Sequence, residues 1–506
     1  MALAMVLTRA ALGVEAPLVS VEVHLSNGLP GLSLVGLPET TVKEARDRVR
    51  SAILNSGFTF PVKRITVNLA PADLPKEGGR YDLPIAIAIL AASEQISADK
   101  LPHYEFLGEL ALTGALRGIQ GAIPASIAAL SEGRQLILSG DNQQEVALIQ
   151  HGESLVGYHL QEVCAFLNGQ QSLSSAIIPP FTECPTQQDL SEIIGQEQAK
   201  RALEITAAGG HNLLLLGPPG TGKTMLASRL PGLMPPLSNR EALECASIAS
   251  LVSTATLQHK WRQRPFRSPH HSSSMFALVG GGSLPRPGEI SLAHNGVLFL
   301  DELPEFGRNV LDALREPIES GEISISRARA KVTYPARFQL VAAMNPSPSG
   351  HYSGIHNRCS PQQTLRYLSR LSGPFLDRFD LSLEVPLLPP GTLSRQVRGH
   401  ETSEIVRERV FAAREKQLAR SAKVNAILTN TEIQQWCSIS QQDAEWLEDV
   451  LIRLGLSARA WQRLLKVART IADLADEENI QRNHLHEALS YRAIDRLFIH
   501  LHKSIE

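Results

Sequence analysis

A glycine-rich segment directly after an apolar run is the part of this sequence best suited to chemistry. Four leucines precede Gly217-Pro-Pro-Gly-Thr-Gly-Lys-Thr224, which matches G-x-x-x-x-G-K-[ST] at every position. The leucines predict a strand buried on both faces, and residues 225–230 predict a helix. Backbone N–H groups of such a loop and the positive helix N-terminus cradle phosphates. The residues expected around a bound nucleotide are Gly217, Pro218, Pro219, Gly220, Thr221 and Gly222.

The end of this loop and a second apolar run supply the reactive groups. Lys223 would reach the β- and γ-phosphates, and the Thr224 hydroxyl would hold Mg²⁺. The second run, Gly296-Val-Leu-Phe-Leu-Asp-Glu302, ends in two carboxylates. We expect Asp301 to bind Mg²⁺ largely through its water shell, and Glu302 to polarise the attacking water. The two motifs predict nucleotide hydrolysis. The sequence has no Asn-Lys-x-Asp motif that reads guanine, so ATP is favoured.

Composition limits the class of protein. The 506 residues suggest about three domains, and 43% hydrophobic with 20% charged residues is typical of a soluble globular protein. The net charge of −2 means that any polyanion contact must come from a local basic feature. The five cysteines lack disulfide-framework or zinc-site spacing, and no apolar run reaches the roughly 18 residues of a membrane helix. Residues 1–7 lack the basic start of a signal peptide, so we expect a cytoplasmic protein.

We expect an N-terminal domain over residues 1–168, because from Val19 to about Asn168 the sequence alternates predicted strands and helices. Asn68-Leu-Ala-Pro-Ala-Asp-Leu-Pro-Lys-Glu-Gly78 and Gly108-Glu-Leu-Ala-Leu-Thr-Gly114 resemble the Lon/ribosomal-protein-S5-like α+β domain of some ATPases. Peptidase members of that family use a serine and a lysine. An ungapped alignment puts Arg80 and Ile123 at those positions, and neither can act as nucleophile or base. The resemblance therefore implies a scaffold or partner-binding domain without peptidase activity.

Residues 169–188 are polar and contain prolines, which predicts a linker. Beyond the glycine-rich loop, three segments are more specific: Arg264-Pro-Phe-Arg-Ser-Pro-His-His-Ser-Ser-Ser274, Leu278-Val-Gly-Gly-Gly282 and Pro285-Arg-Pro-Gly-Glu-Ile-Ser-Leu-Ala-His-Asn-Gly296. They resemble the Mg-chelatase-like AAA+ ATPases of the ComM/YifB family. The resemblance covers essentially the whole chain.

That resemblance implies an α/β fold with an AAA+ P-loop core over residues 189–390 and a helical lid over residues 391–506. It also implies a homo-oligomeric, hexameric ring that hydrolyses ATP while acting on DNA, with branch migration in recombination or natural transformation. Two alternatives stay open. A chelatase-type motor that inserts a metal into a porphyrin would have almost the same core, and an ATP-switched assembly scaffold would bind protein partners.

A hairpin is the candidate DNA-binding element. Residues 308–316 predict a helix that ends before Pro317, and residues 322–326 and 331–334 predict the two arms. The tip carries three cations that alternate with small residues, Arg327, Arg329 and Lys331. We expect them to project from one side. They form either a solvated basic turn or, as a resemblance to the pre-sensor-1 hairpin of helicase rings implies, contacts to DNA phosphates.

The resemblance assigns further roles. Asn345, at the end of an apolar segment, matches sensor 1, which orients the attacking water or reads the γ-phosphate. The adjacent His270 and His271 lack carboxylate or cysteine partners at ligand spacing. We therefore expect these histidines to have a loop-structural role or a nucleotide-dependent contact rather than to bind a metal.

Two arginine-rich segments complete the expected site. Phe375-Leu-Asp-Arg-Phe-Asp380 matches the arginine-finger segment, so Arg378 is the candidate finger from a neighbouring subunit and Arg370 the runner-up. The alternative for Arg378 is a salt bridge to Asp377 or Asp380. Leu456-Ser-Ala-Arg-Ala-Trp-Gln-Arg463 resembles the sensor-2 helix, which assigns Arg459 to the phosphates. Helical spacing alone does not choose among Arg459, Arg463 and Arg469.

Overall fold

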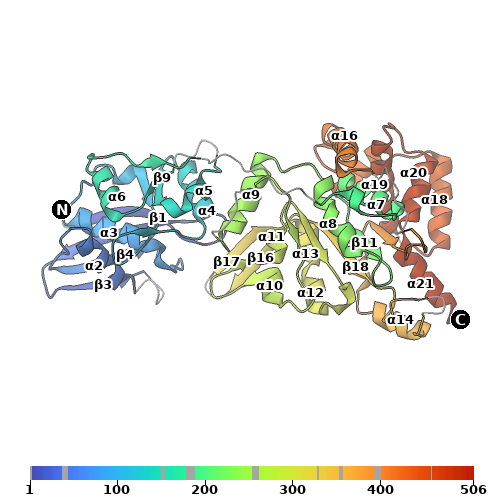
Figure 1. Cartoon of the computed structure of the whole chain (residues 1–506), viewed down its shortest axis with the longest axis horizontal. Coiled ribbons are helices and arrows are strands. Elements are labelled where there is room, and N and C mark those ends of the chain that lie inside the picture. The colour runs from blue at the N-terminus through green and yellow to red at the C-terminus, as the bar shows by residue number, and fades with distance from the viewer. Residues whose placement is uncertain are drawn as a thin grey trace.

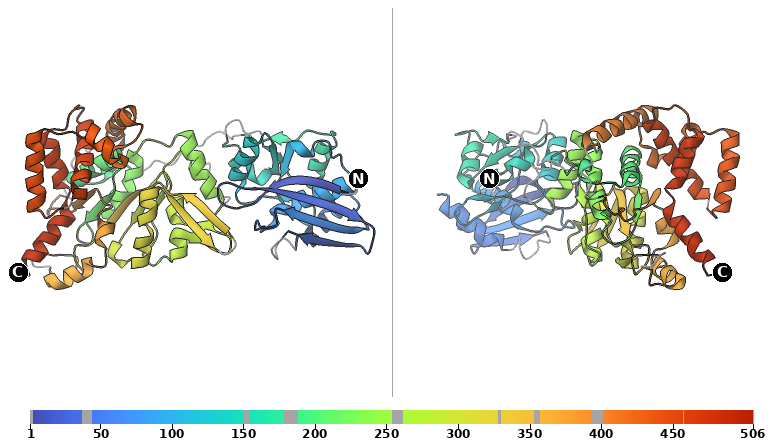
Figure 2. Two further views of the ribbon diagram at one scale, coloured as in Figure 1. Left: turned by 180° about the vertical axis from the view of Figure 1, so that it is seen from behind. Right: turned by 45° about the vertical axis from the view of Figure 1, so that its right-hand side comes forward.

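Two β-sheets, one in each half of the chain, organise the molecule, and helices gather beyond the second (Figure 1). The computed structural model describes residues 3–36, 44–149, 154–177, 188–253, 261–327, 330–352, 357–392, 401–456 and 458–505. The N-terminal body and the C-terminal helices lie on opposite sides of a central body (Figure 2). None of the helices in these residues has the length and apolarity needed to cross a membrane.

The N-terminal sheet is mixed, because β1 pairs antiparallel with β2 and parallel with β5. Its strands are, across the sheet, β10 (Ser174–Ser175), β9 (Leu155–Gly157), β8 (Gln135–Ser139), β5 (Tyr104–Phe106), β1 (Leu3–Arg9), β2 (Leu18–Ser26), β4 (Arg64–Ala70) and β3 (Gly31–Val35). Every second residue from Val19 to Leu25 is buried, so one face of the sheet packs on the core. The buried helix α3 (Asp82–Ala92) lies against β1 and β2, with α2 (Ala45–Asn55) beside it.

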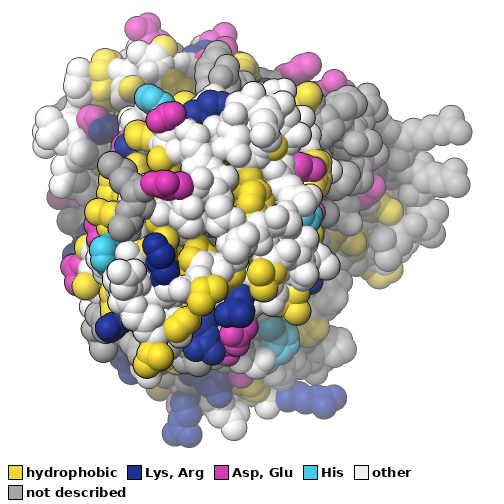
Figure 3. Space-filling view, turned by 90° about the vertical axis from the view of Figure 1, so that its left-hand side faces the viewer, with side chains coloured by type: hydrophobic (Ala, Val, Ile, Leu, Met, Phe, Trp, Pro, Cys, Tyr) yellow, Lys and Arg dark blue, Asp and Glu magenta, His cyan; other side chains and the backbone are white. Residues whose placement is uncertain are grey.

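Shorter elements complete the N-terminal body: β6 (Glu109–Leu110), β7 (Leu116–Arg117), α4 (Ala122–Ser131), α5 (Gln143–Val146) and α6 (Leu160–Leu167). α4 also packs against α9 (Asn239–Ser250) of the central body. There Ile123 shares an apolar cluster with Ala246, and Gly121 N donates to Ser250 O at 2.8 Å. On the opposite end of this body, Lys and Arg side chains lie among acidic and apolar ones (Figure 3).

A five-stranded parallel sheet forms the central body, which confirms the α/β class. Its strands are, across the sheet, β12 (Phe266–Arg267), β15 (Val297–Leu300), β18 (Gln339–Met344), β11 (Leu213–Leu216) and β19 (Leu381–Glu384). The three inner strands are buried on both faces. α7 (Glu197–Gly209) packs on β19, and α8 (Lys223–Leu233) packs on β15 and β18. Because the strands run in one direction, the residues that follow β11, β15 and β18 emerge at one edge.

Short helices and strands connect the sheet to the hairpin: α10 (Met275–Val279), β13 (Gly280–Gly281), β14 (Arg286–Pro287), α11 (Glu289–Leu292), α12 (Arg308–Ala313) and α13 (Arg315–Ser320). The prediction of one helix that ends before Pro317 is wrong. The chain forms two helices, and Pro317 is the third residue of α13. The first N–H groups of a helix have no intrahelical acceptor, so a residue without an N–H is tolerated there.

The hairpin consists of β16 (Glu322–Arg327) and β17 (Ala330–Pro335). Ser326 pairs with Lys331, and Arg327 pairs with Ala330. Paired residues share a face while neighbours in a strand alternate, so Arg327 and Lys331 lie on opposite faces. The expectation that the cations project from one side is therefore wrong for these two, because the turn reverses the chain between them. Arg329 lies outside the described residues.

The C-terminal part is helical: α14 (Pro361–Leu368), α15 (Gly373–Leu376), α16 (Ser403–Ser421), α17 (Asn430–Trp436), α18 (Gln441–Arg453), α19 (Ala458–Leu474), α20 (Arg482–Ser490) and α21 (Ala493–Lys503). α16 and α19 pack on α7, whereas α21 packs on β19 and α14 (Figure 1). These helices are thus attached to the core beside the strand that leads into the glycine-rich loop.

Candidate active site

The glycine-rich loop follows β11 directly, and its glycines meet local requirements of the backbone. A Cβ on Gly217 would lie 2.3 Å from the carbonyl oxygen of Val385, which leaves no room for a side chain. Gly220 and Gly222 have φ angles of 79° and 84°, in the left-handed region that glycine adopts readily. α8 begins at Lys223, so a helix N-terminus adjoins the loop. A glycine-rich loop that leads into a helix N-terminus is suited to binding phosphate.

Lys223 is folded back on this loop. Its Nζ donates to the backbone oxygens of Gly217 and Pro218 at 2.8 Å each, and to Asn345 Oδ1 at 3.4 Å. Burial lowers the pKa of Lys223, and the nearby Asp301 carboxylate opposes that shift. Neutral carbonyls compensate a buried ammonium less well than anionic oxygens do. Phosphate oxygens would therefore replace them favourably.

Thr224 and Asp301 form a pair of oxygen donors beside the loop. Thr224 Oγ1 donates to Asp301 Oδ2 at 2.6 Å, and Glu302 N donates to Asp301 Oδ1 at 2.9 Å. The hydroxyl comes from the first turn of α8 and the carboxylate from the end of β15. Such hard oxygen donors fit Mg²⁺, which is bound through one or two protein groups and retained waters. Bound there, Mg²⁺ would neutralise charge on the phosphates.

Glu302 is constrained at its backbone and at its carboxylate. Its φ of 54° and ψ of 47° lie in the left-handed region, where residues other than glycine are uncommon. Its Oε2 lies 2.9 Å from Nδ1 of His271. The ring of His271 is 4.1 Å from that of His270. The sequence predicted a loop-structural role or a nucleotide-dependent contact for these histidines. In the structure, His271 contacts the carboxylate of Glu302, the candidate general base. No local sequence pattern predicts this contact.

A cavity of about 900 Å³ joins these groups, and Asn345 lines it together with the loop, Asp301 and Glu302. Its other side is formed by residues of α14 and the turn after it, Gln363, Arg366, Tyr367 and Arg370. Arg370 Nη1 donates to Glu305 Oε1 at 3.0 Å. The structure thus brings Arg370, the runner-up for a finger, into its own chain's site. It also adds Arg366, which sequence reasoning missed.

Arg378 lies elsewhere, and within the described residues it is not part of this cavity lining. Its guanidinium forms an ion pair with Glu319, near the end of α13, and its side chain is 19% exposed. The alternative partners expected from sequence are engaged by other groups. Asp377 pairs with Arg463 at 2.8 Å, and Asp380 lies 3.3 Å from His211.

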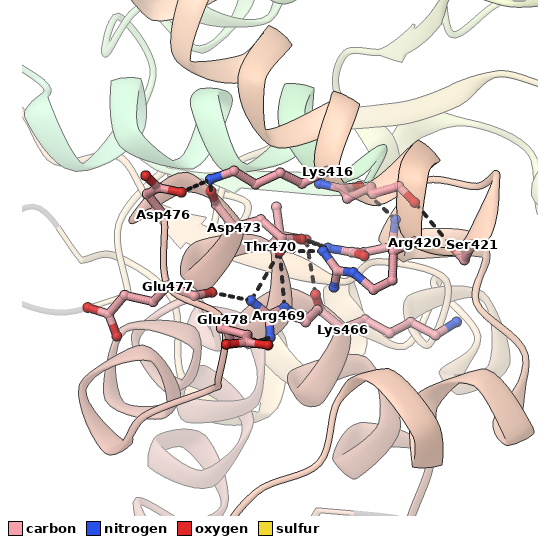
Figure 4. Close-up of polar contacts among 12 residues, drawn as sticks. Lys416, Arg420, Ser421, Lys466, Arg469, Thr470, Asp473, Asp476, Glu477 and Glu478 are labelled. Carbon is pink, nitrogen blue, oxygen red and sulfur yellow. Dashed lines mark hydrogen bonds and ion pairs between the residues drawn. The ribbon is translucent and has the colours of Figure 1, made fainter.

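The three arginines of α19 occupy different environments. Arg459 is exposed and is not among the described residues that line the cavity. Arg463 contacts the turn that carries Arg378. Arg469 is buried in a polar cluster (Figure 4), where it donates to Asp473 Oδ1 at 3.1 Å and, at 2.6 Å each, to the backbone oxygens of Glu477 and Glu478. Arg469 therefore stabilises the end of its own helix.

The hairpin cations differ in their surroundings. Arg327 lies over the ring of Phe276 in α10, with its guanidinium carbon 5.2 Å from the ring centroid. Lys331 is exposed on the opposite face, next to Thr333, which hydrogen-bonds with Ser324 across the hairpin at 3.0 Å. One cation is thus partly anchored, and the other extends into solvent.

Three family models and several relatives match this chain. The family model described as magnesium chelatase, subunit ChlI, matches residues 189–393. Models for subunit ChlI of Mg-chelatase and for the ChlI C-terminal region match residues 21–142 and 400–492. A magnesium-chelatase 38 kDa subunit of Cereibacter sphaeroides is 28% identical over 215 residues, 38% of this chain and 58% of that protein.

Two relatives match nearly end to end. The uncharacterized protein YifB of Escherichia coli strain K12 is 68% identical over 503 residues, 99% of each chain. Competence protein ComM of Haemophilus influenzae is 61% identical over 507 residues, 98% of this chain and 99% of that protein. The chain therefore belongs to the Mg-chelatase-like ComM/YifB family of AAA+ ATPases.

Proposed function

We propose that this chain is one subunit of a homo-oligomeric, hexameric ring that hydrolyses ATP to move along or remodel branched or single-stranded DNA. A relative that is 61% identical is named competence protein ComM, which supports a role in competence. In that setting, migration of DNA junctions is the activity we propose. The N-terminal body would serve as a scaffold or bind a protein partner.

The hairpin is the observation that carries the DNA part of this proposal. It presents Lys331 on one face and Arg327 on the other, and both are exposed. Glu319, three residues before β16, forms an ion pair with Arg378. If a DNA phosphate binds the hairpin, the segment before β16 would feel that contact. Through Glu319, this segment contacts Arg378, the candidate arginine finger.

Within one chain, each residue of the ATP site would have its own task. The loop and Lys223 would bind the phosphates, Thr224 and Asp301 would hold Mg²⁺, and Glu302 would accept a proton from the attacking water. One carboxylate oxygen of Glu302 lies 2.9 Å from Nδ1 of His271, so while that contact holds only the other oxygen would accept from the attacking water. Release of the His271 contact would free both oxygens of this base.

Two roles depend on the γ-phosphate and on a neighbouring subunit. Asn345 lines the cavity beside Lys223 and would orient the water or read the γ-phosphate. Arg378 lies outside its own cavity lining, so as a finger it would stabilise charge on a neighbour's ATP. The same reasoning makes Arg459 a contact to a neighbour's phosphates.

The test is the ATPase rate with and without forked, four-way and single-stranded DNA, with Glu302→Gln as the inactive control. The proposal predicts stimulation by at least one DNA. No stimulation by DNA, with ATPase activity that appears only beside chelatase partner subunits, would argue for the second candidate. That candidate is a chelatase-type motor, which the matches to three magnesium-chelatase family models favour. Turnover too slow to cycle, with partner binding that follows nucleotide state, would indicate an assembly scaffold.

A further inference from the structure

An arginine of α19 forms hydrogen bonds with the turn that carries Arg378. Arg463 Nη2 donates to Asp377 Oδ1 at 2.8 Å, and Nη1 donates to the backbone oxygens of Asp377 and Phe379. The Arg463 side chain is only 12% exposed. One guanidinium therefore contacts the residue before Arg378 and the residue after it.

The same turn is fixed on its other side by residues that lead into β11. Asn212 Nδ2 donates to the backbone oxygen of Arg378 at 2.9 Å, and Asn212 N donates to Asp380 Oδ2 at 3.1 Å. β11 carries the glycine-rich loop at its far end. The backbone of Arg378 is thus held between the strand of its own ATP site and a helix of the C-terminal part.

We propose that Arg463 is a positioning residue for Arg378, and that it sets where this guanidinium stands at a neighbour's ATP. This inference rests on the proposed role of Arg378 as a finger. Both Nη atoms of Arg463 are committed to acceptors in the turn, which argues against a phosphate contact by Arg463 itself. Movement of α19 relative to the core would be transmitted directly to the finger.

The expected cost follows from geometry. Without Arg463, two carbonyls and a carboxylate of the turn lose their donor, and the backbone around Arg378 is free to shift. Misplacement of a reacting group by about 1 Å can cost on the order of 10²-fold in rate. We therefore expect Arg463→Ala to lose about that much turnover, less than the about 10³–10⁵-fold that a finger supplies. Arg463→Lys, which keeps the charge but not the planar fork, should recover only part of it.

Mixed rings separate positioning from the alternatives. Arg463→Ala chains keep an intact ATP site and lack a competent finger, so mixing them with Glu302→Gln chains should restore ATPase. Mixing them with Arg378→Ala chains should restore none, because every finger is then defective. If Arg463 served its own chain's ATP, both outcomes would reverse, and that reversal would overturn the proposal. Subunit exchange is confirmed with a labelled chain. Arg453→Ala, at an exposed position on the preceding helix, controls for loss of a charge.

Two further measurements complete the test. Asp377→Asn weakens the contact between Arg463 and the turn but leaves Arg463 in place. It should therefore lower turnover, and its activity should recover with Glu302→Gln chains but not with Arg378→Ala chains. Unchanged or faster turnover of Asp377→Asn would mean that Arg463 itself contacts the neighbour's phosphates. Arg378→Ala mixed with Glu302→Gln is the reference. If that pair fails to recover, the finger assignment fails; if it recovers while Arg463→Ala with Glu302→Gln does not, only the positioning role fails.

Discussion

Glu302 has a strained backbone conformation, and its carboxylate contacts His271. A residue other than glycine in the left-handed region costs of the order of 1–3 kcal/mol, and such residues cluster where function needs them. The backbone N–H of Glu302 donates to Asp301 Oδ1. The two neighbouring carboxylates thus face different partners, Thr224 for Asp301 and His271 for Glu302. This separation fits one metal ligand and one base.

That separation of tasks predicts different defects. Lys223→Ala should abolish ATP binding, because it removes the cation at the phosphate site. Glu302→Gln should bind ATP normally and lose about 10²–10⁴-fold in turnover, the usual contribution of a general base. Equilibrium binding of a fluorescent ATP analogue and steady-state hydrolysis separate the two defects. Near wild-type turnover by Glu302→Gln would show that another group activates the water.

The contact between His271 and Glu302 predicts a gain of activity. With the imidazole removed, the carboxylate is free to take the attacking water. A hydrogen bond to a charged group contributes about 1.5–3 kcal/mol when buried, and these side chains are 33% and 57% exposed. We therefore expect His271→Ala to raise the DNA-free ATPase rate several-fold. His270→Ala is the control, because His270 Nδ1 contacts Ser272 instead. A slower His271→Ala enzyme would mean that His271 aims Glu302 at the water.

At the scale of elements, the hairpin should bind DNA through separate faces. Replacing Arg327, Arg329 and Lys331 together by alanine should weaken DNA binding and DNA stimulation. Each lost phosphate contact should reduce the slope of log affinity against log salt by roughly 0.7–0.9. Alanine at Arg240, Arg308 and Arg453, which are all exposed, removes the same charge elsewhere. Equal slopes for the two triple variants would show that the hairpin is a solvated turn that does not contact DNA phosphates.

Elements with strong local signals could be predicted from the sequence. The inner strands β11, β15 and β18 are continuous apolar runs because both faces are covered, and the hairpin arms alternate buried and exposed residues. The errors arose where geometry depends on neighbours. Pro317 fits a helix because α13 starts just before it, and the turn places Arg327 and Lys331 on opposite faces.

Only those residues of the site that belong to recognisable sequence motifs could be predicted. The glycine-rich loop, Asp301, Glu302 and Asn345 follow adjacent strands of a parallel sheet, so their convergence is a consequence of topology. The contacts His271–Glu302 and Arg378–Glu319 join segments far apart in the chain. No periodicity or spacing encodes such pairs. They depend on how α10, α13 and the turn before β19 pack, which becomes visible only in three dimensions.

On the scale of the whole molecule, the N-terminal body supports the hairpin. Leu12 and Val14, in the connection between β1 and β2, pack against the apolar cluster that includes Ile325 and Val332. A Cβ on Gly13 would come within 2.8 Å of Val332. The cluster of Ile123, Ile149 and Ala246 secures the same docking beside α9. The body therefore limits how the base of the hairpin can move.

This docking predicts that a single charge can uncouple the hairpin from the N-terminal body. Ile123→Asp would place a carboxylate in the apolar cluster, where an uncompensated buried charge costs about 3–5 kcal/mol. Each body keeps its own core, so we expect separation without unfolding. Scattering should show a larger radius of gyration, and DNA stimulation of the ATPase should fall because the hairpin loses its support. Ile127→Asp lies one turn along α4 at an exposed position and should change neither property. If Ile123→Asp separates the bodies and leaves DNA stimulation intact, the hairpin works without this support.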